Sequence, residues 1–150
     1  MKLTNSQEEY LKTIYLLQKN NKKVRVTDIA LKLNITKPSV NKAINVLKDM
    51  GILNYKAYGN ITLTKEGEKA AIEIIKKQDI LEMFLVEILQ IDEKQAEEEA
   101  IAMKHAISEQ TTQKLNKFIK QTMNLDCDYD ESSEKCKNCI KIKAKKICKQ

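Results

Sequence analysis

The fold is decided by the stretch TKPSVNKAINVLKDMG, residues 36–51. Thr36 is a preferred N-cap residue, and Pro38 follows in the first turn, where a helix leaves its N–H groups without partners. Gly51 suits the left-handed residue that commonly follows a helix. Within the stretch, apolar side chains recur at helical spacing, at Val40, Ile44 and Leu47. The pattern predicts an amphipathic helix with a polar N-terminal turn.

Two shorter helices are predicted before this stretch. The first begins with a capping box in which Ser6 is the cap and Glu9 follows three residues later. The second runs from Asp28 to Leu33 with Thr27 as its cap, and residues 24–26 between the two helices predict one short strand. A tight connection leads from the second helix into the third, which is the arrangement of a helix-turn-helix.

Two short strand-like runs follow, and they complete the N-terminal domain as a wing. They span residues 52–55 and 61–63 and enclose a polar loop that contains a Gly-Asn turn. Helices are predicted beyond the wing in three stretches: residues 64–91, 96–109 and 111–123. The sequence therefore predicts a mainly α fold, with a winged helix-turn-helix in residues 1–66, an all-helical domain in residues 67–125 and a small cysteine-rich tail in residues 126–150.

Composition places the chain among ordinary globular proteins. Its 150 residues are 42% hydrophobic and 32% charged. No apolar run approaches the ~20 residues that a membrane-spanning helix needs. The first residues also lack the apolar stretch of a secretory signal. We therefore expect a cytoplasmic protein with no membrane partner.

The net charge of +6 is unevenly distributed along the chain. Residues 1–66 carry 12 basic and 5 acidic side chains, residues 67–125 carry 8 and 11, and residues 126–150 carry 7 and 5. The balances are +7, −3 and +2. Such an asymmetry favours contact between the first segment and a polyanion, although lysine placed wherever solvent allows would give the same count.

A helix of this kind can enter the major groove of DNA with its N-terminal residues facing the base edges. Asn41 can pair with adenine, Lys42 can donate to guanine or phosphate, and Pro38 can touch a thymine methyl group. The wing tip would reach phosphate or the minor groove. The candidate DNA-binding residues are Thr36, Lys37, Pro38, Ser39, Asn41, Lys42, Lys56, Tyr58 and Asn60. The alternative is a winged helix that binds only protein.

All four cysteines lie in the last 24 residues, with the spacing C-x8-C-x2-C-x8-C. They are Cys127, Cys136, Cys139 and Cys148. Four thiolates suit zinc or a [4Fe–4S] cluster, and the single C-x-x-C with long flanks resembles the cluster loop of endonuclease-III-like proteins. Disulfides are unusual in cytosolic chains, and four unligated thiols are the remaining alternative.

Several short motifs together resemble the diphtheria-toxin-repressor family of iron- and manganese-dependent regulators. Their order and spacing carry the resemblance over residues 3–123. They are Leu11-x-x-Ile14-Tyr15-x-Leu17, Val26-Thr27-Asp28-Ile29-Ala30, Pro38-Ser39-Val40, Leu47-x-x-x-Gly51-Ile52-Leu53, Leu63-Thr64-x-x-Gly67, Leu81-Glu82-x-Phe84-Leu85 and Glu98-Glu99-Ala100-x-x-x-x-His105-x-x-Ser108.

The resemblance implies a homodimer built on residues 67–123 that binds a palindromic operator in double-stranded DNA, with metal loading tightening the binding. It also implies base contacts by Pro38, Ser39, Asn41 and Lys42, with Thr36 near the backbone.

The same resemblance places two metal sites whose ligands this chain has largely lost. The primary site falls on Glu9, Ile101, Lys104 and His105, and the second site falls on Gln78, Glu82 and Glu97. Isoleucine has no donor atom, and an ammonium group repels a cation. Iron or manganese is therefore not expected at the inherited positions. We hypothesise that the Lys104 ammonium replaces the metal charge and pairs with Glu9.

Three functions remain open at this point. A transcriptional regulator, with repression expected, that senses iron, metal or redox state through its tail is the preferred interpretation. A metal-independent DNA binder with a structural zinc knot is the second. A thiol oxidoreductase using Cys136 and Cys139 is the third, but the pair lacks a strand–helix redox context, and the sequence shows no Ser/His/Asp set and no glycine-rich phosphate loop. We therefore predict that the chain is not an enzyme.

Overall fold

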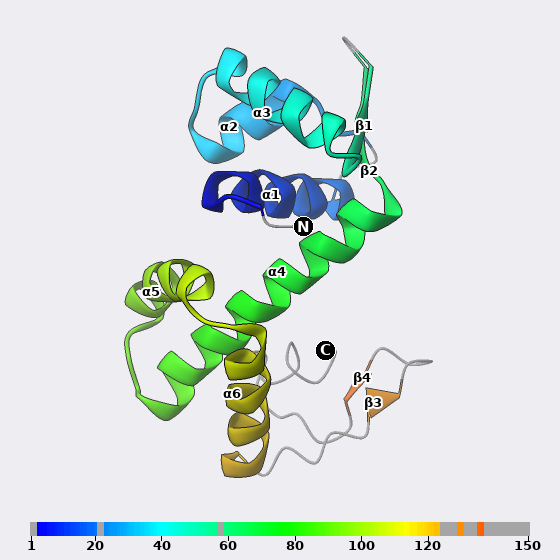
Figure 1. Cartoon of the computed structure of the whole chain (residues 1–150). Coiled ribbons are helices and arrows are strands. Elements are labelled where there is room, and N and C mark those ends of the chain that lie inside the picture. Colours follow the sequence, from blue (N-terminus) through cyan, green and yellow to red (C-terminus); the bar gives the residue numbers. More distant parts are fainter. Residues whose placement is uncertain (1–2, 21–22, 57–58, 124–128, 131–134, 137–150) are drawn as a thin grey trace. The chain divides into compact units, whose positions relative to one another are not determined.

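The computed structural model describes residues 3–20, 23–56, 59–123, 129–130 and 135–136. It confirms the mainly helical fold with a small two-stranded wing (Figure 1). The elements in chain order are α1 (Asn5–Asn20), α2 (Val26–Leu33), α3 (Lys37–Asp49), β1 (Leu53–Tyr55), β2 (Ile61–Leu63), α4 (Lys65–Met83), the π-helical turn η1 (Phe84–Ile88), α5 (Glu93–Ala106), α6 (Glu109–Thr122), β3 (Tyr129–Asp130) and β4 (Lys135–Cys136).

The chain divides into two compact units within α4. The N-terminal unit spans Met1–Ile75 and the C-terminal unit spans Lys76–Gln150. The domain boundary predicted between residues 66 and 67 lies at the start of this same helix and stays a prediction. Among the described residues, no helix is long and apolar enough to cross a membrane.

The N-terminal unit has an apolar core shared by its helices and its wing. In Figure 1, α1, α2 and α3 lie together, and the β1–β2 ribbon follows α3. The strands pair antiparallel with Leu53 opposite Leu63 and Tyr55 opposite Ile61. The buried residues of this core are Tyr10, Leu11, Ile14, Val24, Ile29, Ala30, Val40, Ile44, Leu47, Ile52, Leu53, Ile61 and Ala71.

The third helix begins and ends as its sequence predicts. Thr36 is the N-cap of α3, and its hydroxyl oxygen accepts a hydrogen bond from the Ser39 N–H at 3.4 Å. Pro38 lies in the first turn. Met50 is the C-cap, and Gly51 follows with a φ of 73°, a left-handed conformation that costs glycine little.

The two earlier helices begin before the residues predicted as their caps. At α1 the reciprocal bonds join Thr4 and Gln7, because the Gln7 N–H donates to Thr4 Oγ1 at 3.3 Å and the Thr4 N–H donates to Gln7 Oε1 at 2.8 Å. The box predicted at Ser6 and Glu9 is therefore wrong. Both pairs satisfy the same spacing rule, and the structure uses Thr4 and Gln7.

The strand predicted over residues 24–26 is also wrong beyond its first residue. Val24 forms a single bridge, in which the Ile61 N–H donates to the Val24 carbonyl at 2.9 Å. Arg25 is already the N-cap of α2, and its N–H donates to the Asp28 carboxylate at 2.8 Å. Thr27 therefore lies inside the helix that it was predicted to cap. Asp28 stabilises the earlier start because its charge lies in the first turn.

The start of α4 packs closely on the wing. The Thr64 hydroxyl donates to the carbonyl oxygens of Gly51 and Ile52, at 2.9 and 3.0 Å. The Gly67 N–H donates in turn to Thr64 Oγ1 at 3.1 Å. A Cβ on residue 67 would collide with the Ile52 carbonyl oxygen, so glycine is required by this close approach.

The C-terminal unit contains a smaller apolar core formed by Leu81, Leu85, Ala96 and Ala100. The long helix predicted to end near residue 91 passes from α geometry into η1, where the Leu89 N–H bonds to the Phe84 carbonyl at 3.2 Å. Both α5 and α6 contact this π-helical turn. Asp92 and Ser108 cap these helices, so α5 and α6 begin earlier than the predicted residues 96 and 111.

The described part of the tail is a short hairpin. Strands β3 and β4 pair antiparallel, with Tyr129 opposite Cys136 and Asp130 opposite Lys135. Cys127, Cys139 and Cys148 lie outside the described residues, and the structure describes only the backbone placement of Cys136.

Candidate nucleic-acid interface

Helix α3 presents one apolar face and one polar face. Val40, Ile44 and Leu47 are fully buried in the core of the N-terminal unit. The residues predicted to contact DNA from this helix and its cap are all exposed: Thr36, Lys37, Pro38, Ser39, Asn41 and Lys42. The buried face holds the helix in place, and the exposed face leaves the polar groups free to meet a ligand.

The N-terminus of α3 is suited to a negatively charged partner. No acidic residue lies in its first turn, and Lys37 adds a positive charge to the partial positive charge of the helix end. The hydroxyl groups of Thr36 and Ser39 lie 2.9 Å apart and fix the geometry of this turn. Phosphate groups are the kind of anion that such a helix end attracts.

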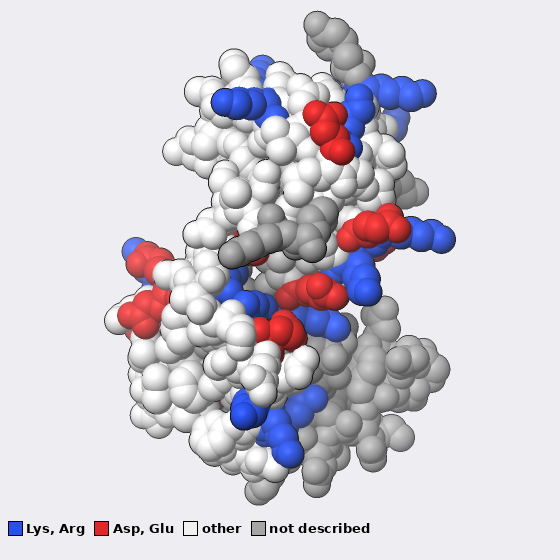
Figure 2. Space-filling model, in the orientation of Figure 1, with Lys and Arg blue, Asp and Glu red and all other residues white. Residues whose placement is uncertain are grey.

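The wing brings further polar groups to the N-terminal unit. Lys56 and Asn60 are exposed, and the Gly59 N–H closes the turn on the Lys56 carbonyl at 2.8 Å. Tyr58, also predicted to bind DNA, lies outside the described residues. Figure 2 shows basic side chains around the part of the molecule that carries α2, α3 and the wing.

Three exposed polar residues complete this surface without having been singled out in the sequence. Asn45 and Lys48 follow Asn41 at four- and seven-residue intervals, so they lie on the same face of α3. The helical spacing of polar residues was the signal for them. Arg25 is exposed at the N-terminus of α2, where the sequence predicted a strand.

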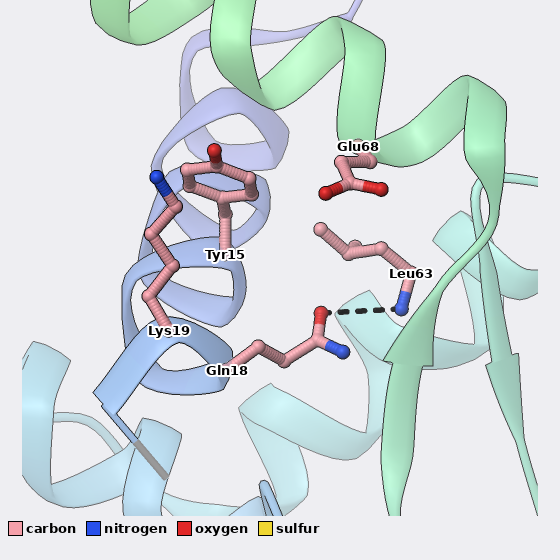
Figure 3. Close-up of a pocket in the computed structure, with 5 residues that line it drawn as sticks. All are labelled: Tyr15, Gln18, Lys19, Leu63 and Glu68. Atoms are coloured by element: carbon pink, nitrogen blue, oxygen red, sulfur yellow. Dashed lines mark hydrogen bonds between the residues drawn. The ribbon is translucent and has the colours of Figure 1, made fainter. Parts of the chain in front are cut away.

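A small pocket lies within the N-terminal unit, between α1, β2 and the first turns of α4 (Figure 3). Its volume is about 180 Å³, and it is lined by Tyr15, Gln18, Lys19, Leu63 and Glu68. The Leu63 N–H donates to Gln18 Oε1 at 3.3 Å, and Lys19 Nζ lies 5.0 Å from the centroid of the Tyr15 ring. The Gln18–Leu63 bond ties the wing to α1 and so helps to fix the wing beside α3.

The positions implied for metal ligands fall in both units. In α1, Glu9 is half-buried and pairs with Lys12, with 3.9 Å between Lys12 Nζ and Glu9 Oε2. In α4, Gln78 Nε2 donates to Glu82 Oε1 at 2.8 Å. In α5, Glu97 is exposed, Ile101 and His105 are half-buried, and Lys104 is 2% exposed.

Comparison with known families decides the identity of the fold. Residues 2–61 match the N-terminal DNA-binding domain of iron-dependent repressors, and residues 64–128 match their metal-binding and dimerisation domain. The chain belongs to the iron-dependent repressor family. This is the diphtheria-toxin-repressor family that the motifs indicated, so that prediction is confirmed. The family consists of transcriptional regulators, which also confirms the prediction that the chain is not an enzyme.

Two relatives illustrate the family match. An uncharacterized HTH-type transcriptional regulator of Methanocaldococcus jannaschii is 38% identical over 120 residues, which are 79% of this chain and 96% of the relative. The HTH-type transcriptional regulator MntR of Lysinibacillus sphaericus is 34% identical over 105 residues, covering 70% of this chain and 75% of the relative.

Among solved structures, the manganese regulator SloR matches with a TM-score of 0.69 and 28% identity. The match covers 78% of this chain and 54% of that structure's chain, so the present chain spans about half of its length.

Two of the inherited metal positions in the C-terminal unit, Ile101 and Lys104, offer no ligand to a divalent ion, even though the family domain binds metal. Ile101 offers no lone pair, and the ammonium group of Lys104 carries the charge of a cation itself. Among the described residues, no group of three or more His, Cys, Asp or Glu side chains is arranged to hold a metal ion. Manganese and iron need several oxygen or nitrogen donors that converge on one point.

Proposed function

We propose that the chain is a sequence-specific DNA-binding transcriptional regulator that acts as a homodimer on a palindromic operator. The single observation that carries this proposal is the exposed, cationic N-terminal half of α3, held by a fully buried opposite face. A two-fold pair of such helices matches the two-fold symmetry of a palindromic site. The family's DNA-binding and dimerisation domains support the same assignment.

In this proposal α3 reads the bases and its surroundings hold the DNA backbone. Asn41 would pair with adenine, and Lys42 would donate to guanine or to phosphate. The Thr36 cap and Lys37 would approach the backbone beside the helix N-terminus, and the wing residues Lys56 and Asn60 would fix the register. Pro38 and Ser39 lie on the same exposed turn and would meet the adjacent base.

The proposal is tested by selecting duplexes from a random library with the full chain and measuring affinity by fluorescence anisotropy. We expect a palindromic consensus whose affinity falls steeply with salt, because released counterions drive binding. Replacing Lys42 with Ala should reduce the salt slope by about 1, whereas Lys94→Ala, an exposed lysine on α5, should leave it unchanged. The absence of salt-sensitive affinity for any duplex would contradict the proposal.

We further propose that the four cysteines of the tail hold zinc or a [4Fe–4S] cluster and that this centre reports metal or redox state to the dimer. The spacing C-x8-C-x2-C-x8-C supports the proposal, because four thiolates suit either centre.

Metal analysis tests the tail directly. Protein purified with and without oxygen would be assayed for iron, zinc and acid-labile sulfide. Iron with sulfide in the anaerobic sample alone identifies a cluster, and about one zinc per chain in both samples identifies a zinc site. Replacing Cys136 and Cys139 with Ser should change operator affinity if the centre regulates the dimer. Trace metal in every sample would contradict the proposal.

A further inference from the structure

One face of α5 carries a buried lysine in line with two alanines. Ala96, Ala100 and Lys104 follow at four-residue spacing, and their exposed fractions are 0%, 0% and 2%. Residues four apart lie on the same side of a helix, so the three form the inner face of α5. Both alanines belong to the apolar core of the C-terminal unit. This inner face therefore carries a full positive charge near the end of the helix.

A buried ammonium group is unfavourable unless neighbouring groups compensate for its lost hydration. Lys104 does take part in an interaction in the structure. It also lies in the last turn of α5, where a cation is stabilised by the partial negative charge of the helix end. The burial of this charge is thus a specific feature of the unit rather than the solvated position that most lysines occupy.

We infer that Lys104 provides, as a permanent part of the chain, the positive charge that a metal ion provides in metal-responsive members of the family, and that divalent ions therefore do not regulate the C-terminal unit. The consequence for operator binding rests on the proposed function. A covalently attached cation cannot dissociate, so this unit would have a single charge state whatever the metal supply. Regulation would then have to enter the molecule elsewhere.

Two further positions that the family resemblance assigns to metal ligands agree with a site that works without metal. Ile101 is half-buried one turn away from Lys104 and has only carbon atoms in its side chain. The Glu82 carboxylate already accepts the Gln78 amide at 2.8 Å. Neither Ile101 nor the Lys104 ammonium group offers the lone pair that a divalent ion would require.

A second lysine joins the end of α5 to α4 through a hydrogen bond. Lys77 Nζ donates to the carbonyl oxygen of Ile107, the C-cap of α5, at 2.6 Å. Carbonyl groups at a helix C-terminus lack partners within the helix, so this bond satisfies one of them with a charged donor. The orientation of α5 against α4 is therefore held by a group of the chain itself.

The inference is tested in the full chain carrying Cys136→Ser and Cys139→Ser, so that the C-x-x-C pair cannot chelate the added metal. Calorimetric titration with MnCl2, and with FeCl2 without oxygen, should detect no site. The melting temperature should be the same in manganese and in EDTA. About one bound ion per chain, with a raised melting temperature, would overturn the inference without affecting the proposed DNA binding.

The matched variants in the same background are Lys104→Met and Lys94→Met, which remove one charge each from the inner and outer faces of α5. We expect Lys104→Met to weaken operator binding on the order of tenfold, within the usual range of coupling between sites. Lys94→Met should bind like its parent. Equal affinity of Lys104→Met and its parent would overturn the inference.

Circular dichroism would show whether Lys104→Met is folded. If it is not, the manganese titration of the parent protein decides the question alone. If the unmodified chain binds no duplex, the proposed function fails while the titration still tests the inference.

Discussion

The two units differ in what they bury. The interior of the N-terminal unit is an apolar cluster drawn from all of its helices and strands, and Thr13 is the buried polar residue there among the described residues. The C-terminal unit has a smaller apolar cluster and buries Gln78, Lys104 and Thr112 as well. Asn116 Oδ1 is also buried there without a hydrogen-bond partner among the described residues. The C-terminal unit therefore buries a charged group, whereas the buried polar residue described in the N-terminal unit is uncharged.

The largest effect should come from the apolar core that supports α3. Ile44→Ala removes a fully buried side chain and should lower the free energy of unfolding by about 2–5 kcal/mol, because it leaves a cavity. Val46→Ala, two residues away and 40% exposed, should change it by less than about 0.5 kcal/mol. Urea denaturation measures both. Similar losses in the two variants would show that the apolar core is not what separates the units.

The next largest effect should appear in DNA affinity rather than in stability. Asn41→Ala should cost about 1–3 kcal/mol of binding to the selected operator, because a bidentate contact with a base is lost. Binding to an unrelated duplex should change little, since phosphate contacts remain. Gln113→Ala, an exposed change on α6, serves as the control in the same anisotropy titration. A uniform loss on both duplexes would assign Asn41 to the backbone instead.

In the C-terminal unit, removal of the Lys77 bond should have an intermediate effect. Lys77→Met keeps the methylene stem but leaves the Ile107 carbonyl without its 2.6 Å donor, and it should cost about 1.5 kcal/mol. Lys76→Met, at the adjacent half-buried position, should have a smaller effect. Hydrogen exchange at the end of α5 reports the change locally. Unchanged exchange there would mean that apolar packing alone holds this helix.

The smallest losses of stability should come from the helix caps, and they should be equal in the two units. Thr36 caps α3 and Ser108 caps α6, and each accepts a hydrogen bond from the N–H three residues later, at 3.4 and 3.2 Å. Thr36→Ala and Ser108→Ala should therefore each cost about 1 kcal/mol of stability. Thermal unfolding of the two variants tests this symmetry. A much larger loss at Ser108 would show that the C-terminal unit depends on its caps because its core is small.

The sequence-based predictions were more accurate where an element depends on neighbouring residues than where it depends on residues far along the chain. The cap and end of α3 were predicted correctly because Thr36, Pro38 and Gly51 act on their immediate neighbours. The start of α2 was predicted wrongly because the strand pairing stops at Val24, which pairs with Ile61 far along the chain. Arg25 is then the N-cap of α2. The turn η1 was missed because α-helical and π-helical segments share almost the same apolar pattern.

The candidate DNA-binding surface was largely predictable, and the interior of the C-terminal unit was not. Asn41 and Lys42 lie between residues that are buried or half-buried at helical spacing. The apolar periodicity therefore predicts that both side chains are exposed. The replacement of metal ligands at Ile101 and Lys104 is a prediction that the family resemblance makes from the sequence. The near-complete burial of Lys104 could not be predicted, because lysine is among the residues most often found in solvent.

The amino-acid sequence alone determined the order of the helices, the wing, the amphipathic character of α3 and the family. These properties depend on residues close together in the chain and on their periodicity. Only the tertiary structure decided which cap closes α1, where α2 begins, and that one lysine of α5 is buried while another is exposed. Those outcomes depend on which side chains, distant in the sequence, exclude water from a given position. The local spacing of residues does not indicate them.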